Sequence, residues 1–357
     1  MSVASAMDQE VLTLPECGSA DVERIGGKAV GLCRLLDLAL DVPAGFVVTT
    51  ATFRRWMDDC GLGREVRRLL HGTADTAATR AAADAIGELF DGRSLQSRAI
   101  DRAYEELCDG GEAPVAVRSS AIGEDVAASS YAGQQETFLC VRGAAAVRHH
   151  VVQCWASLFS AEAITYRRHL GIPAYQAEMA VVVQRMVPAE AAGVMFTVDP
   201  MTWDPSQITI ESTIGLGTPL VGGEITPDRY CVDKVTLEVR SRAIAAKPFA
   251  DRLDGDAGVT HRIVLSASES RASSLTDEEV GELSEIGRRL ERAVGSPMDV
   301  EWAIGPANGR TRHLFLLQAR PQTGRPLRPP SASRRSAMEH MVAGLRRSRA
   351  IDKEAAG

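Results

Sequence analysis

The feature that most restricts the fold is a pair of strand-like runs near the end of the sequence. In MDVEWAI (Met298–Ile304) and in HLFLLQAR (His313–Arg320), polar side chains recur at every second position within an apolar run. Successive residues of a β-strand point to opposite faces of a sheet, so each run would have a polar and an apolar face. If the two runs pair, one wall of an antiparallel sheet carries Asp299, Glu301, Gln318 and Arg320.

Strands and helices alternate through the rest of the chain. Short apolar runs predict strands at 45–50, 115–117, 179–187, 193–200, 208–213 and 229–244. Helical patterns are found at 51–110, 147–171 and 276–294. At the start of the last helix Thr276 and Glu279 form a capping-box pair, and Gly295 follows its end. This mixture predicts an α+β fold with antiparallel pairs late in the chain.

The composition argues against several classes of protein. The chain has 357 residues, of which 45% are apolar and 24% are charged, as in globular proteins with more than one subdomain. Its formal net charge of −7 argues against general nucleic-acid binding. No apolar run is long enough to cross a membrane, and the N-terminus has no signal-peptide pattern. The seven cysteines are scattered without a C-x-x-C pair, so we expect a reduced, cytoplasmic protein without a structural zinc.

Two short motifs are suited to binding phosphate. Gly26 and Gly27 precede an apolar helix whose N-terminus favours an anion, and Lys28 adds a point charge in a chain that has only four lysines. Arg118 leaves a buried strand directly before two serines, where its planar guanidinium can bind phosphate oxygens. Each motif also has a plain explanation: an ordinary turn at a helix start for the first, and a surface ion pair for the second.

The polar wall of the two closing strands is suited to a hard cation. Carboxylates and an amide oxygen are the protein ligands that Mg²⁺ takes when it is held together with nucleotide phosphates. The plain alternative is a solvated face of the sheet. The seven histidines form no cluster with metal-ligand spacing, and no serine–histidine–aspartate pattern is present.

Taken together, the motifs resemble one family. The sequence contains, in this order, GGKAVGL, VAVRSSAIGEDVAASSYAGQQETFL, AITYRRHLGI, VVVQRMV, AGVMFTVDP, IESTIGLG, ITPDRY, DVEWAI and LLQARPQT. They are similar to the N-terminal nucleotide-binding region of phosphoenolpyruvate synthase, pyruvate phosphate dikinase and rifampicin phosphotransferase. The resemblance covers about residues 10–325. It implies an ATP-grasp type fold of two to three subdomains, with mixed or antiparallel sheets and ATP in the cleft between them.

The resemblance also implies a role for each matched residue. Lys28 and Arg118 would hold the phosphates, and Gly133 and Thr137 would lie over them as part of a lid. Gln184, with the backbone around Met186 and Val187, would meet the adenine. Glu301 and Gln318 would hold Mg²⁺ with Asp299 nearby, and Arg320 would clamp the phosphoryl group in transfer. Lys28, Arg118 and Arg320 would thus act in catalysis, because phosphoryl transfer needs mainly positioning and charge neutralisation.

The chain departs from the family pattern in two ways. Family members usually have a glutamate after GLG, whereas Thr218 stands there in this sequence. In the family, a further domain carries a histidine in a Gly-rich Ser-His context that accepts phosphate, and no histidine of this chain has that context. We therefore expect the histidine domain to be a separate protein.

These features lead to three functional hypotheses. The first is an Mg²⁺- and ATP-dependent phosphotransferase that passes a phosphoryl group to a separate phosphohistidine-domain protein or to a small-molecule acceptor. The second is a stand-alone ATP-grasp kinase or ligase that activates a carboxylate or hydroxyl, and the third is a non-catalytic ATP-binding subunit. None of them involves nucleic acid or a membrane, and the sequence does not identify the acceptor.

The expected domain organisation follows from the same motifs. Residues 1–190 would form the N-terminal part of the ATP-grasp domain, with the GGK loop and the RSS lid loop. Residues 191–325 would form the C-terminal subdomain with the Mg²⁺-binding strands, and the Pro-, Ser- and Arg-rich residues 326–357 a basic linker and a short helical tail.

Overall fold

The chain forms two compact units, which are described separately. The computed structural model describes residues 9–18, 22–73, 75–122, 136–254, 258–308 and 311–323. Unit 1 comprises Met1–Asp37 and Pro43–Met186, and unit 2 comprises Leu38–Val42 and Val187–Gly357. The predicted tail at 326–357 lies outside the described residues.

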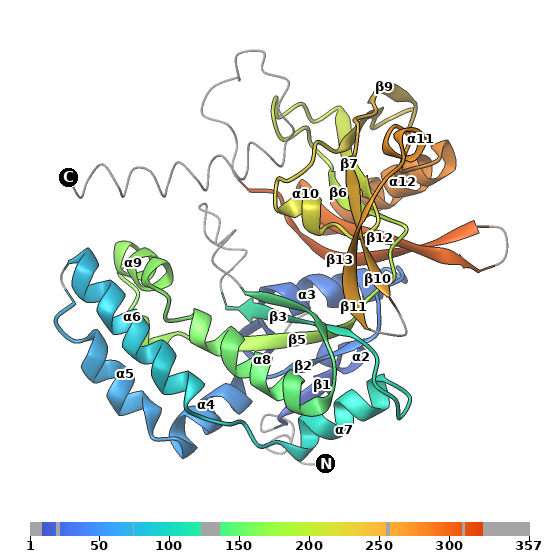
Figure 1. Ribbon diagram of the computed structural model, residues 1–357. Helices are drawn as coiled ribbons and strands as arrows, with labels where there is room; N and C mark the ends of the chain where they lie inside the picture. Colours follow the sequence, from blue (N-terminus) through green and yellow to red (C-terminus); the bar gives the residue numbers. More distant parts are fainter. Residues whose placement is uncertain are drawn as a thin grey trace. The chain divides into compact units, whose positions relative to one another are not determined.

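Unit 1 contains a five-stranded sheet in the order β1-β2-β5-β3-β4, in which every neighbouring pair is antiparallel (Figure 1). Its strands are β1 (Val11–Thr13), β2 (Gly45–Val48), β3 (Val115–Ala121), β4 (Thr137–Val141) and β5 (Met179–Arg185). The central strand β5 is apolar along almost its whole length, which is typical of a strand that is covered on both faces.

Helices cover both faces of this sheet. On one face α3 (Val22–Asp37) packs against β3 and β5. The other face is covered mainly by α4 (Thr50–Asp59), α5 (Leu62–Leu70), α6 (Thr76–Asp91), α7 (Arg98–Leu107), α8 (Ala144–Ser157) and α9 (Ala161–His169), which enclose a core around Trp56, Phe90 and Trp155. Two short helical segments, α2 (Leu14–Cys17) and η1 (Ala174–Gln176), complete the described part of the unit.

One sequence-based expectation in this unit is wrong. We expected a single helix over 147–171, but the structure has two, α8 and α9. The second begins at its own N-cap, where the Ser160 hydroxyl accepts a hydrogen bond from the amide of Ala163 at 3.1 Å. A capping serine satisfies the free amides of a new helix, so the chain can change direction there without losing backbone hydrogen bonds.

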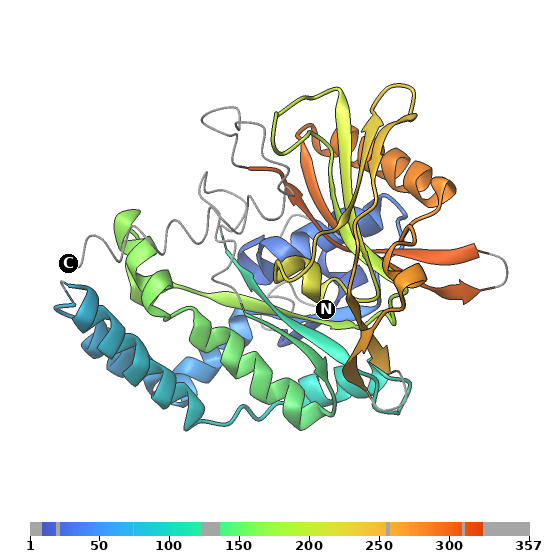
Figure 2. The ribbon, with the colours of Figure 1, turned by 45° about the horizontal axis from the view of Figure 1, so that its top comes forward.

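Unit 2 is built on a six-stranded antiparallel sheet in the order β13-β12-β6-β7-β8-β9 (Figure 2). Its strands are β6 (Ala191–Phe196), β7 (Gln207–Ile214), β8 (Asp228–Asp233), β9 (Val239–Ala243), β12 (Met298–Asn308) and β13 (Thr311–Pro321). The other elements are the hairpin of β10 (Phe249–Asp254) and β11 (Val259–Val264), and the helices α10 (Thr218–Val221), α11 (Ala267–Ser270) and α12 (Asp277–Val294).

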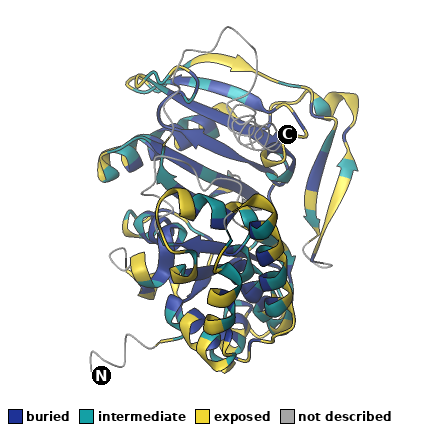
Figure 3. Cartoon of the chain, turned by 90° about the vertical axis from the view of Figure 1, so that its left-hand side faces the viewer, coloured by how far each residue is buried: buried dark blue, intermediate teal, exposed yellow. Residues whose placement is uncertain are grey.

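Helix α12 covers one face of the six-stranded sheet. It contacts β6, β7 and β12, and an added Cβ on Gly287 would lie 2.9 Å from the sulfur of Met195 on β6. The predicted capping box of Thr276 and Glu279 is confirmed, as is the glycine that ends the helix, Gly295. Figure 3 shows most strands of the two sheets largely buried, whereas the edge strand β9 and the hairpin strand β11 are largely exposed.

The structure confirms the predicted α+β class, since helices and antiparallel sheets form both units. It also confirms that the two closing runs pair, as β12 and β13. Within the described residues, no helix is both long enough and apolar enough to cross a membrane.

Candidate functional site

The glycine pair before Lys28 marks a sharp change of direction within α3. Gly26 has φ 74° and ψ 170°, so the helix is interrupted there and starts again after it. An added Cβ on Gly26 would lie 2.0 Å from the carbonyl oxygen of Ser120, which leaves no room for any side chain. Glycine is therefore required both for the left-handed backbone and for the close approach of α3 to β3.

This approach brings the GGK and RSS motifs together. The Lys28 ammonium donates to the carbonyl oxygen of Ser119 at 2.7 Å. The Ser120 hydroxyl donates to the carbonyl oxygen of Ile25 at 2.8 Å and accepts from the amide of Ala29 at 3.2 Å. The sequence motifs gave no role to Ser120, the second serine after Arg118. It joins the two motifs because it satisfies backbone groups exposed by the interruption at Gly26.

Three further predicted residues share the face of the sheet on which α3 lies. Arg118 is two residues from Ser120 on β3, so both side chains point to this face. Thr137 on β4 is paired directly with Arg118. Gln184 on β5 is paired with Ala116, which is also on this face, and its buried side-chain amide donates to the carbonyl oxygen of Pro43 at 3.3 Å. Unit 1 thus places Lys28, Arg118, Thr137 and Gln184 on one side of its sheet.

Met186 and Val187 follow β5 at the division between the two units. The amide of Met186 donates to the carbonyl oxygen of Pro114 at 3.1 Å, and its sulfur lies 2.9 Å from the amide nitrogen of Cys140. Val187 is buried and is the first residue of the second segment of unit 2. The predicted lid residue Gly133 lies outside the described residues.

In unit 2 the predicted polar wall exists with direct cross-strand pairs. Glu301 is paired with Gln318, and Asp299 with Arg320. The register shifts just after Glu301, so that Leu317 is an extra residue on β13. The two pairs share a face of the sheet. The residues of each pair lie directly opposite each other, and along each strand the two residues are two positions apart.

Asp299 and Arg320 form an ion pair on this wall. The Arg320 guanidinium contacts one oxygen of Asp299 through Nε at 3.0 Å and through Nη2 at 2.9 Å. Burial raises the pKa of the Asp299 carboxyl and the neighbouring Glu301 charge adds to this, while Arg320 opposes it. The carboxyl groups of Asp299 and Glu301 are therefore close enough to influence each other's charge.

The donor set of this wall fits Mg²⁺ bound together with phosphate. Glu301 and Gln318 supply a carboxylate and an amide oxygen from neighbouring positions, and both are hard ligands. Across the described ranges, no group of three histidine, cysteine, aspartate or glutamate side chains is placed to hold a metal ion by itself. A cation on Glu301 and Gln318 would thus need further oxygens, which is how Mg²⁺ is held when phosphates complete its shell.

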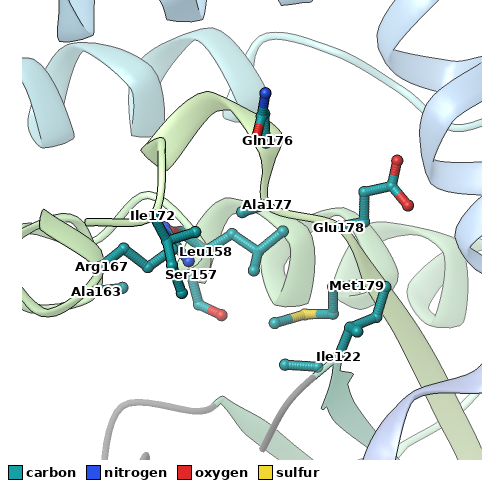
Figure 4. A pocket seen from close by; sticks show the side chains of 11 residues that line it. Ile122, Ser157, Leu158, Ala163, Arg167, Ile172, Gln176, Ala177, Glu178 and Met179 are labelled. Carbon is teal, nitrogen blue, oxygen red and sulfur yellow. The ribbon is translucent and has the colours of Figure 1, made fainter. Parts of the chain in front are cut away.

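Unit 1 also has a pocket on the other side of its sheet, with a volume of about 280 Å³ (Figure 4). It lies among α8, α9 and η1, and its walls include Ala121, Leu158, Arg167 and Met179. Ala121 follows Ser120 on β3 and therefore points to the face opposite α3. The pocket is separate from the residues around Lys28.

Comparison with protein families matches residues 22–341 to the family described as "Pyruvate phosphate dikinase, AMP/ATP-binding domain". The match extends over almost all the residues discussed above, from the start of α3 beyond the end of β13.

Several curated proteins are similar to this chain. It is 38% identical over 318 residues to the probable phosphoenolpyruvate synthase of Methanocaldococcus jannaschii, covering 87% of this chain and 26% of that protein. It is 37% identical to the phosphoenolpyruvate synthase of Aeropyrum pernix, with 88% and 42% covered, and 36% identical to a rifampicin phosphotransferase of a Streptomyces species, with 88% and 36% covered. The chain thus spans less than half the length of these relatives.

Proposed function

This chain belongs to the family of the pyruvate phosphate dikinase AMP/ATP-binding domain, and from this premise we propose that it binds Mg-ATP and transfers a phosphoryl group. The observation that carries the proposal is the pairing of Glu301 with Gln318 on one wall of unit 2. Their oxygens are suited to a cation that also binds phosphate. The similarity to phosphoenolpyruvate synthases and rifampicin phosphotransferases supports the same chemistry.

In this proposal the residues of unit 1 bind the nucleotide. Lys28 and Arg118 neutralise the phosphates, and Thr137 belongs to the lid over them. Gln184 and the backbone at Met186 and Val187 receive the adenine. The proposal includes the ATP-grasp arrangement, with ATP in a cleft between subdomains, which the family match supports.

The residues of unit 2 hold the cation and the phosphoryl group. Glu301 and Gln318 would bind Mg²⁺, with Asp299 beside them, and Mg²⁺ would supply neutralisation of the phosphate charge. Arg320 would contact the phosphoryl group in transfer. Asp299 holds the Arg320 guanidinium in place at 2.9–3.0 Å, and an arginine fixed in this way loses less conformational entropy when it binds a second anion.

The acceptor is a separate phosphohistidine-domain protein or a small molecule. The first is the acceptor that the resemblance to the family implies. One observation favours direct transfer to a small molecule by a kinase or ligase: Thr218 stands where the family usually has a glutamate, and its hydroxyl is hydrogen-bonded to Asp251 at 2.9 Å. The third hypothesis, a non-catalytic ATP-binding subunit, predicts binding without turnover.

The experiment is ³¹P NMR of Mg-ATP with the protein, with and without a small-molecule extract and a candidate histidine-domain protein. We expect AMP with phosphate or pyrophosphate if the chemistry is that of a dikinase. ADP alone would support the kinase or ligase hypothesis instead. Glu301→Ala is the control, and an unchanged rate in this variant would contradict the assignment of the cation site. If no sample turns over ATP, tight binding of Mg-ATP would support the non-catalytic subunit.

A further inference from the structure

Helix α10 lies on the same face of the unit 2 sheet as the proposed cation ligands. Leu220 of α10 packs in a cluster with Val194 and Phe196 of β6. Val194 is paired directly with Glu301, so its side chain and that of Glu301 point to the same face from neighbouring strands. Helix α10 therefore forms a wall one strand away from Glu301.

The glycine turn before α10 is equally close to this face. An added Cβ on Gly217 would lie 3.7 Å from the Cβ of Ala192, which is two residues before Val194 on β6. Any shift of α10 across the sheet would therefore change the surroundings of Glu301, because well-packed neighbours transmit displacements rather than absorb them.

The hairpin of β10 and β11 is bound to the start of α10. The Thr218 hydroxyl donates to one carboxylate oxygen of Asp251 at 2.9 Å, and the amide of Leu216 donates to the backbone carbonyl of Asp251 at 2.8 Å. Gly215, with φ +79°, makes this approach possible, because an added Cβ would lie 2.3 Å from the carbonyl oxygen of Asp251.

The same hairpin is bound to the end of α10 through Arg262, which is paired with Asp251 across the hairpin. Its guanidinium donates to both oxygens of Asp251, at 2.8 and 3.1 Å, and to Glu224 at 2.6 Å. Glu224 follows α10, and its amide donates to the carbonyl oxygen of Pro219 at 2.9 Å. The guanidinium also lies 4.0 Å from the ring centre of Phe249. The Asp251 carboxylate thus accepts hydrogen bonds from Thr218 at the start of α10 and from Arg262, which also binds Glu224 after the end of α10.

We propose that Asp251 is a positioning residue for the cation site, holding α10 beside Glu301 through Thr218 and Arg262. This inference rests on the proposed function, since it assigns a task in the binding of Mg-ATP to a residue outside the nucleotide motifs. Asp251 touches neither phosphate nor cation in this role. Outer residues that orient a metal site commonly change metal affinity or activity about 10- to 100-fold when they are replaced.

The test measures the affinity for ATP by calorimetry with and without Mg²⁺. In Asp251→Asn and Thr218→Val we expect Mg-ATP to bind about tenfold more weakly, with little change for ATP alone, because only the cation ligands are displaced. Thr218→Ser keeps the hydroxyl and should retain the affinity of the unaltered protein. Such a rescue would not be seen if the residue merely filled space.

The matched control is Asp233→Asn. Asp233, the last residue of β8, also forms an ion pair with an arginine, Arg240 of β9, at the edge of the sheet opposite β12 and β13. We expect this variant to bind Mg-ATP normally.

Two results would overturn the inference. One is normal binding of Mg-ATP by Asp251→Asn when Glu301→Gln has lost it. The other is an equal loss with and without Mg²⁺, which would show a general effect on folding. If the unaltered protein and Glu301→Gln both bind ATP without any effect of Mg²⁺, the proposed cation site itself is wrong, and the inference is overturned with it.

Discussion

The two sheets of this protein carry polar faces that differ in both charge and assembly. The unit 1 face has the cations Lys28 and Arg118, and it forms because α3 crosses a strand whose Ser119 is 91 residues from Lys28. The unit 2 face has Asp299 and Glu301 with one arginine, Arg320, and it forms because two successive strands lie directly opposite each other at these positions. The first depends on long-range packing and the second on local strand pairing.

The comparison suggests a division of tasks within the proposed function. Lysine and arginine suit phosphate oxygens, whereas a carboxylate with an amide oxygen suits Mg²⁺. Replacements in unit 1 should then weaken ATP binding whether or not Mg²⁺ is present. Replacement of the unit 2 cation ligands, Glu301 and Gln318, should weaken only the part that depends on the cation.

The largest effect is expected for Glu301→Gln. The amide keeps the size of the side chain but loses the negative charge, so Mg-ATP turnover should fall about 1,000-fold, or ~4 kcal/mol in the activation free energy. Initial rates at several Mg²⁺ concentrations would measure this. Glu238→Gln, at an exposed carboxylate of the same unit, is the control and should be unchanged. If Glu301→Gln turned over Mg-ATP within threefold of the normal rate, the assignment of cation binding to unit 2 would be contradicted.

The second largest effect is expected for Gly26→Ala, which disrupts the packing of α3 against β3 in unit 1. Alanine at φ +74° and ψ 170°, a conformation that essentially only glycine adopts, costs about 1–2 kcal/mol, and the contact with the Ser120 carbonyl adds to it, so we expect unit 1 to lose about 3–4 kcal/mol of stability. Hydrogen exchange should increase in α3 and β3 but not in β12 and β13. Gly18→Ala has a similar backbone, with φ +64° and ψ 144°, and no neighbour within 4 Å, so it should lose only about 1–2 kcal/mol. Equal effects of the two variants would show that the close approach to Ser120 does not matter.

A smaller effect is expected for Lys28→Met. Loss of one phosphate-binding charge should weaken ATP binding about tenfold, or ~1.4 kcal/mol, both with and without Mg²⁺. Calorimetric titration would measure both values. Lys234→Met is a suitable control, because Lys234 binds Glu291 in unit 2 at 2.9 Å. A loss that appears only with Mg²⁺ would mean that Lys28 belongs with the cation site.

The smallest effect concerns the pH dependence of unit 2. Burial raises the folded-state pKa of Asp299 above its usual 3.8, so the folded protein binds this proton more readily than the unfolded chain does. The contribution of Asp299 to stability is complete below about pH 3.8 and is lost as the pH rises through the raised pKa, with a slope of at most about 1.4 kcal/mol per pH unit. Urea unfolding of both proteins from pH 3.5 to 7 measures this, because the difference in unfolding free energy between the unaltered protein and Asp299→Asn should have this slope.

Asp233 is a reference carboxyl group whose pKa is shifted in the opposite direction, downward. Bonds from the amide of Thr236, from Arg240 and from the amide of Val235 lower its pKa to about 2. NMR titration of the two carboxyl groups should therefore separate them on either side of pH 3.8. If the pKa of Asp299 is at or below the pKa of Asp233, burial does not raise the pKa of Asp299 and this prediction is wrong.

Much of unit 2 followed from local patterns in the sequence. The spacing of Asp299 and Glu301, and of Gln318 and Arg320, determined which side chains share a face once the strands pair. The capping box at Thr276 was equally local. The single helix expected over 147–171 failed at Ser160, because the apolar pattern continues through a point at which a serine cap starts a second helix.

By itself, the sequence determined the α+β class, the paired polar strands and the motifs of the nucleotide-binding family, because each depends on residues close together in the chain or on a known order of motifs. Only the tertiary structure decided that Ser120 joins the GGK turn to the RSS strand, and that Asp251 binds Thr218 beside the Glu301 wall. These contacts depend on the packing of segments that are far apart in the sequence. No local periodicity encodes such packing, so they could be found only from the folded chain.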